Sequence, residues 1–147
     1  MKHIAIFASG EGTNAQNIID YFKDSDKVKI ALVVSNKANA NVLNRAKKAG
    51  IPTLLISRTD FYDSNNTIDA LKKANIDFIV LAGFLWMIPS NLVQAFPNKM
   101  INIHPALLPK FGGKGMYGMN VHKAVVEANE TESGISIHYV NEQYDEG

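Results

Sequence analysis

Short apolar runs alternate with amphipathic segments along most of the chain. The runs are rich in Ile, Val and Leu, and most of them stop at a serine, a glycine or another polar residue. Continuous runs of this length are typical of strands that are buried on both faces of a sheet. They predict strands at residues 3–8, 29–35, 53–57, 77–83, 100–104 and 134–140.

Apolar residues recur at helical spacing between these runs. From Ala15 to Phe22 they repeat every three or four positions, and Thr13 or Asn14 is expected to be the N-cap of this first helix. Three further segments predict helices: residues 39–50, which Gly50 and Pro52 close, a segment that turns Ile68 and Leu71 inward, and residues 119–129.

Strands that alternate with helices indicate right-handed crossover connections. We therefore predict an α/β fold, a Rossmann-like three-layer sandwich with a mostly parallel central sheet. Ligands bind at the carboxyl ends of the strands in such sheets. The unusual residues lie at these ends: residues 10–14 follow the first strand, residues 84–88 follow the fourth, and His104 ends the fifth. This organisation predicts a single pocket.

The composition narrows the class of protein. A length of 147 residues predicts one domain, and a net charge of +1 without a dense basic block gives no reason to expect a nucleic-acid or membrane partner. The absence of cysteine excludes disulfides and thiolate metal sites. The N-terminal apolar run is too short for a signal peptide or a membrane span. We expect a soluble cytoplasmic protein.

The segment SGEGTN, residues 9–14, is a glycine-rich turn between a strand and a helix. Glycines let the backbone approach a ligand, and free N–H groups in the first turn of a helix attract phosphate. The segment matches neither the dinucleotide-binding fingerprint nor the Walker pattern, and a plain tight turn is the alternative. Glu11 would repel a phosphate, so its side chain is expected to point away.

The segment AGFLWMIP, residues 82–89, is unusually apolar for the exit of a buried strand. Packing in the core is one interpretation of Phe84, Leu85, Trp86, Met87 and Ile88. Their position at the ligand-binding edge favours another, in which they form an apolar wall for a flat aromatic ligand such as a pterin or a nucleobase.

Asn102 and His104 are two residues apart on one predicted strand, so their side chains are expected to share a face of the sheet. An amide and an imidazole can stabilise an oxyanion and move protons, although a lone histidine is often structural. A metal site is not expected, because the other histidines show no known ligand spacing. Asp145 is a carboxylate that could face His104, or simply part of a solvated turn.

Several of these segments resemble the folate-dependent formyltransferase family. The resemblance rests on SGEGTN, VVSNKANA (33–40), VLAGFLWMI (80–88), NIHPALLP (102–109) and YDEG (144–147), of which the NIHPALLP run is the most specific. It implies transfer of a formyl group from the co-substrate 10-formyltetrahydrofolate, with no metal. The first two segments favour the branch whose substrate is the small molecule glycinamide ribonucleotide. A monomer or a homodimer is implied.

The resemblance also assigns roles to residues. Asn102 would contact the folate and its formyl oxygen, His104 would donate a proton, and Asp145 would raise the pKa of His104. The remaining assignments are the ribonucleotide phosphate for Gly12, Thr13 and Asn14, the folate pocket for Leu85, Trp86, Met87 and Ile88, and an outer supporting layer for Ser136 and His138.

The chain departs from the family pattern in places. Trp86 stands where many relatives carry a folate-contacting arginine, and Asn120 replaces the first histidine of a short H-x-H segment. The family continues past the aspartate, so residues 1–147 are expected to form a formyltransferase domain that lacks a C-terminal strand and helix. The alternatives are a formyltetrahydrofolate hydrolase, a relative of methionyl-tRNA formyltransferase, or a non-catalytic fragment that binds a phosphoribosyl ligand.

Overall fold

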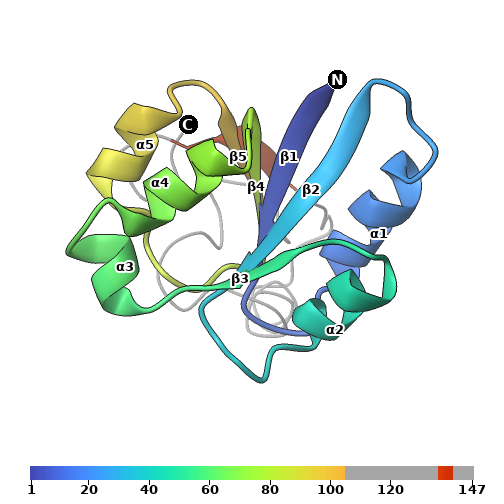
Figure 1. Ribbon diagram of the computed structural model, residues 1–147, viewed down its shortest axis with the longest axis horizontal. Coiled ribbons are helices and arrows are strands. Elements are labelled where there is room, and N and C mark those ends of the chain that lie inside the picture. Colours follow the sequence, from blue (N-terminus) through green and yellow to red (C-terminus); the bar gives the residue numbers. More distant parts are fainter. Residues whose placement is uncertain (105–135, 141–147) are drawn as a thin grey trace, which may run out of the picture.

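A six-stranded sheet forms the centre of the computed structural model, which describes residues 1–104 and 136–140 (Figure 1). The strand order is β3-β2-β1-β4-β5-β6. Neighbours from β3 to β5 pair in parallel, and β6 pairs antiparallel with β5. The strands are β1 (Lys2–Phe7), β2 (Val28–Ser35), β3 (Thr53–Leu55), β4 (Phe78–Ala82), β5 (Met100–His104) and β6 (Ser136–Tyr139). The predicted mostly parallel sheet is confirmed.

Helices cover both faces of this sheet. Figure 1 shows α1 and α2 together on one side and α3, α4 and α5 on the other. Their bounds are α1 (Thr13–Phe22), α2 (Asn41–Lys48), α3 (Arg58–Tyr62), α4 (Asn66–Lys73) and α5 (Ser90–Ala95). The predicted three-layer arrangement is therefore confirmed for the described residues.

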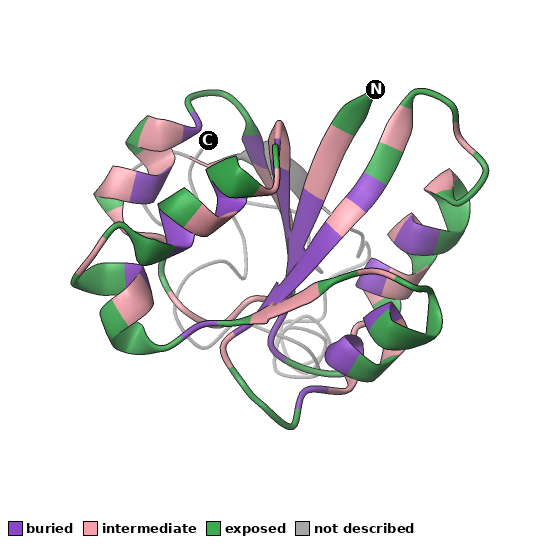
Figure 2. Cartoon of the chain, in the orientation of Figure 1, coloured by how far each residue is buried: buried purple, intermediate pink, exposed green. Residues whose placement is uncertain are grey.

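The core is divided by the sheet into two apolar clusters, and β1 shows why the strand runs are continuously apolar. Ala5 and Phe7 pack into the cluster under α3, α4 and α5, whereas Ile6 and Ala8 pack into the cluster under α1 and α2. Side chains alternate between the two faces of a strand. In a strand that is buried on both faces, every position is therefore expected to be apolar. Figure 2 shows the burial concentrated along these central strands.

Several ends differ from the sequence prediction. β3 stops at Leu55, because Ser57 instead caps α3: its side chain accepts a hydrogen bond from the Asp60 N–H in a reciprocal capping box. The short helices α3 and α5 were not predicted. The predicted N-cap at Thr13 or Asn14 is wrong, since Gly12 occupies that position. The helix predicted at residues 119–129 lies outside the described residues. No described helix is long and apolar enough to cross a membrane.

Candidate functional site

The strand order reverses at β1, which pairs with β2 on one side and with β4 on the other. In open α/β sheets a crevice forms outside the carboxyl ends of the strands at such a reversal. The loop after β1 and the loop after β4 leave the sheet side by side here. Ser9 N–H donates to the Gly83 carbonyl at 3.1 Å, and Leu85 N–H donates to the Ser9 hydroxyl at 2.9 Å.

Ser9 connects three loops at this point. It is 4% exposed, and its hydroxyl also donates to the Asn36 side-chain oxygen, just after β2, at 2.6 Å. The side-chain nitrogen of Asn36 is buried and has no hydrogen-bond partner among the described residues. The sequence analysis missed both residues as site components. A hydroxyl and an amide placed directly after two buried strands were the only signal.

Gly12 begins α1 in a left-handed conformation with φ of 80°, and no side chain caps the helix. A Cβ at this position would lie 2.6 Å from the Val42 Cγ2, so only glycine allows the turn to pack this closely against α2. Thr13 and Asn14 form the first turn, which contains no acidic residue. A glycine cap leaves the first-turn N–H groups without a side-chain acceptor, and these groups favour an anion.

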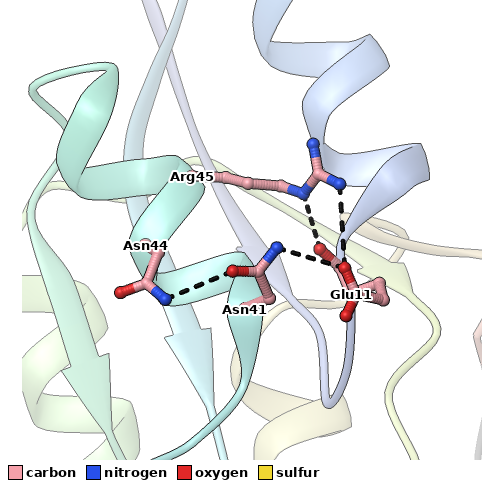
Figure 3. A network of polar contacts seen from close by, with 4 residues as sticks. All are labelled: Glu11, Asn41, Asn44 and Arg45. Carbon is pink, nitrogen blue, oxygen red and sulfur yellow. Dashed lines mark hydrogen bonds and ion pairs between the residues drawn. The ribbon is translucent and has the colours of Figure 1, made fainter.

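Glu11 is held by α2. Arg45 Nε donates to the Glu11 carbonyl at 2.6 Å, and Asn41 Nδ2 donates to the Glu11 carboxylate at 3.1 Å (Figure 3). An ion pair between Arg45 Nη2 and the same carboxylate measures 3.9 Å. The carboxylate is thus engaged by α2, in agreement with the expectation that it does not face the first turn of α1. The sequence analysis did not find Arg45.

The loop after β4, for which core packing and an apolar ligand wall were the two interpretations, is partly buried and partly exposed. Phe84, Trp86 and Ile88 are half-buried and pack against the core cluster under α3, α4 and α5. Leu85 is half-buried without belonging to either cluster, and Met87 is 52% exposed. The loop is therefore partly core, while Leu85 lies outside both clusters and Met87 is mostly exposed.

Aromatic and polar contacts fix the outer part of this loop. The Arg58 guanidinium lies 4.8 Å from the centre of the Trp86 ring, a cation–π distance, and forms no ion pair with a described residue. Tyr62 donates its hydroxyl to the Met87 carbonyl at 2.6 Å. Burial raises the pKa of Tyr62, and the charge of Arg58 opposes this rise. Arg58 and Tyr62 belong to α3, which the sequence analysis did not predict.

Asn102 and His104 both lie on β5, as expected. Ala82 pairs with Ile103, so the end of β5 reaches the start of the loop after β4. On the other side, Asn102 stands opposite His138 of β6 and His104 stands opposite Ser136. This register brings all four predicted positions onto two adjacent strands. Asp145 and the stretch from Pro105 to Pro109 lie outside the described residues, and among the described residues no group of three potential ligands could hold a metal ion.

The sequence matches a family model described as formyl transferase over residues 2–147. It is 45% identical to the chloroplastic phosphoribosylglycinamide formyltransferase of Arabidopsis thaliana over 99% of this chain and 52% of the relative. It is 42% identical to the phosphoribosylglycinamide formyltransferase of Haemophilus influenzae over 100% of this chain and 69% of that protein. The chain therefore spans about half the length of the plant relative.

Solved structures agree with this. Glycinamide ribonucleotide transformylase 1 from Geobacillus kaustophilus superposes with a TM-score of 0.87 at 38% identity, over 100% of this chain and 78% of that one. The phosphoribosylglycinamide formyltransferase of Anaplasma phagocytophilum superposes with a TM-score of 0.87 at 32% identity, over 99% and 67%. The family model, the relatives and the solved structures each match nearly the whole chain. The chain belongs to the formyl transferase family.

Proposed function

We propose that the protein transfers the formyl group of 10-formyltetrahydrofolate to the primary amine of glycinamide ribonucleotide, a step of purine biosynthesis. The observation that carries the proposal is the pair of loops that Ser9 ties together at the strand-order reversal. One loop offers helix N–H groups and the other offers apolar side chains. A family match over residues 2–147 supports formyl transfer, and the chemistry of the two loops is our ground for assigning one to each substrate.

The ribonucleotide phosphate would bind at the N-terminus of α1. Gly12, Thr13 and Asn14 present backbone N–H groups there, and the helix dipole favours a negative charge at the same place. The glycine cap fits this role, because a serine or aspartate cap would occupy the first-turn N–H groups itself. Arg45 pairs with the carboxylate of Glu11, which lies next to this turn.

The folate would lie against the loop after β4. Leu85 and Met87 would contact it directly, while Trp86 and Ile88 would shape the wall from their partly buried positions. Loop backbone groups would meet the polar edge of the pterin. The residues fit such a ligand, because a pocket for a flat aromatic ring needs apolar walls and a few fixed polar groups.

The chemistry would take place at the end of β5, which adjoins β4 on the side away from β1. The substrate amine attacks the formyl carbon and forms a tetrahedral intermediate with an oxyanion. Asn102 and protonated His104 stabilise that oxyanion, and a donor of this kind typically contributes about 3–4 kcal/mol. The bond from the formyl carbon to the folate nitrogen then breaks. The proton lost by the amine reaches that nitrogen through His104, whose pKa Asp145 would raise.

Ser136 and His138 would form an outer layer, since they stand opposite His104 and Asn102 on β6. The scheme uses two small-molecule substrates and neither a metal nor a nucleic acid. A monomeric or homodimeric state and a cytoplasmic location stay predictions from the sequence.

The test is to mix the purified 147-residue chain with glycinamide ribonucleotide and 10-formyltetrahydrofolate and to follow the release of tetrahydrofolate. We expect turnover that needs the amine substrate and that His104→Ala lowers by roughly 10²-fold or more. His3→Ala is the matched control, because His3 lies at the opposite end of the sheet, beside Asp77.

Each other outcome identifies a different function. Folate release without the amine would indicate a hydrolase. If methionyl-tRNA replaces the ribonucleotide in the assay and tetrahydrofolate is then released, the chain belongs to the tRNA-modifying branch. Binding of glycinamide ribonucleotide without any turnover would mean that these residues form a binding module and would contradict the proposed reaction for this chain.

A further inference from the structure

The contact between Arg45 and Glu11 joins two segments that are 34 positions apart in the sequence. Arg45 lies on α2, and Glu11 immediately precedes the glycine cap of α1. The short bond, at 2.6 Å, runs from the Arg45 Nε to the backbone carbonyl of Glu11, so the arginine fixes the main chain of the loop. Figure 3 shows the guanidinium reaching both that carbonyl and the carboxylate.

Two backbone features reinforce this docking. Val42 N–H donates to the Gly10 carbonyl at 3.0 Å, and Gly12 packs against the Val42 side chain. Three consecutive loop residues, 10 to 12, are therefore each held by α2. The direction in which the first turn of α1 presents its N–H groups depends on these contacts.

The ion pair contributes little to the stability of the fold. The Glu11 side chain is 75% exposed and the Arg45 side chain is 28% exposed, and exposed pairs are worth little in water. The ion pair matters instead for the charge next to the N-terminus of α1. A carboxylate one residue before a helix N-terminus opposes an anion there, and pairing it with a guanidinium while Asn41 holds one of its oxygens reduces that opposition.

We propose that Arg45 is a positioning residue for the phosphate of the ribonucleotide substrate, acting through Glu11. It holds the loop in the conformation that presents the first-turn N–H groups of α1, and it pairs with the Glu11 carboxylate beside them. This inference rests on the proposed function, because it assumes that glycinamide ribonucleotide binds at α1.

The experiment compares five variants by calorimetric titration of the full chain with glycinamide ribonucleotide and, separately, with tetrahydrofolate. Arg45→Met should weaken ribonucleotide binding by about tenfold and leave folate binding unchanged. Adding Glu11→Gln to Arg45→Met should recover about threefold of that loss, because it removes the carboxylate that Arg45→Met leaves without its guanidinium partner. Arg45→Lys, which keeps the charge without the planar fork, should give an intermediate affinity.

Lys47→Met is the matched control. It removes the same charge from the same helix, but Lys47 is exposed and forms no hydrogen bond or ion pair with Glu11. If it weakened ribonucleotide binding as much as Arg45→Met does, the effect would be long-range attraction and the inference would be wrong. The inference would also be wrong if Arg45→Met weakened the binding of both ligands equally, or if Glu11→Gln did not restore ribonucleotide affinity. Either result would indicate general disorder of the loop.

Thermal unfolding of each variant shows whether the fold is retained, and Glu11→Gln alone, at an exposed side chain, keeps the test available if Arg45→Met does not fold. That single variant should bind ribonucleotide as tightly as the unmodified chain or more tightly, and weaker binding would overturn the inference. Failure of the unmodified chain to bind glycinamide ribonucleotide would instead overturn the proposed function.

Discussion

The loop after β1, residues 8–12, and the loop after β4, residues 83–89, leave the same edge of the sheet but are held in different ways. The first docks on α2 through backbone hydrogen bonds, an arginine and a glycine that allows close approach. The second docks on α3 through aromatic rings, with Phe84 and Trp86 each within 6 Å of the Phe61 ring centre.

This difference matches what each loop is proposed to bind. Polar contacts and a helix N-terminus suit a small anion, which needs a few N–H groups at fixed positions. Packed apolar side chains suit a flat ring system, which needs area more than exact hydrogen bonding. It follows that changes in the first loop should act through backbone geometry, and changes in the second through buried apolar surface.

The largest expected effect tests the geometric requirement in the first loop. Gly12→Ala places a Cβ against Val42 and imposes a positive φ on a residue with a side chain. Together these should lower the free energy of unfolding by about 3 kcal/mol. Gly10→Ala is the matched control, since its Cβ would meet nothing within 4 Å. Denaturant unfolding of both variants checks this, and an equal loss in the two would show that the close approach to α2 is not what requires glycine.

A smaller effect is expected in the second loop, where stability and binding should separate. Trp86→Ala removes a half-buried ring from the cluster under α3 and should cost about 2 kcal/mol of unfolding free energy. Met87→Ala, at a side chain 52% exposed, should cost under about 0.5 kcal/mol and yet weaken folate binding several-fold. Chemical denaturation and a folate titration of each variant measure the two quantities. If Met87→Ala destabilised the fold as much as Trp86→Ala, both side chains would be core residues and neither would mark the pocket.

The smallest effect concerns the link between the loops. Ser9→Ala leaves the half-buried Leu85 N–H and the Asn36 side-chain oxygen without their partner, which should cost about 1–2 kcal/mol. Because Ser9 touches both loops, the variant should weaken the binding of both substrates by a similar factor. Titrations with each ligand test this. A loss confined to one ligand would mean that Ser9 serves one loop only.

The sheet and its main helices were predictable because their signals are local and repeated. The continuous apolar run of β1 predicts burial on both faces, and Phe7 and Ile6 are buried on opposite sides of the sheet. The regular spacing in α1 likewise anticipated the burial of Ala15 and Ile19. The short helix α3 has too few residues for a period, although the Ser57 and Asp60 capping pair was a readable start signal.

The parts of the site that the sequence analysis missed depend on contacts between distant segments. Nothing near Arg45 in the sequence indicates a bond to Glu11, and nothing near Ser9 indicates that it meets Leu85. The N-cap of α1 was wrong for a related reason. Thr13 and Asn14 are better capping residues than glycine in isolation, but the approach of the loop to Val42 moves the helix start to Gly12.

The central claim is that the loop after β1 binds the ribonucleotide and the loop after β4 binds the folate. Backbone amide NMR of the full chain during two separate titrations tests this claim most directly. With glycinamide ribonucleotide, the account predicts the largest shift changes at Gly12, Thr13 and Asn14. With tetrahydrofolate, it predicts them at Leu85 and Met87. Ribonucleotide shifts centred on the loop after β4, or folate shifts centred on the N-terminus of α1, would contradict it.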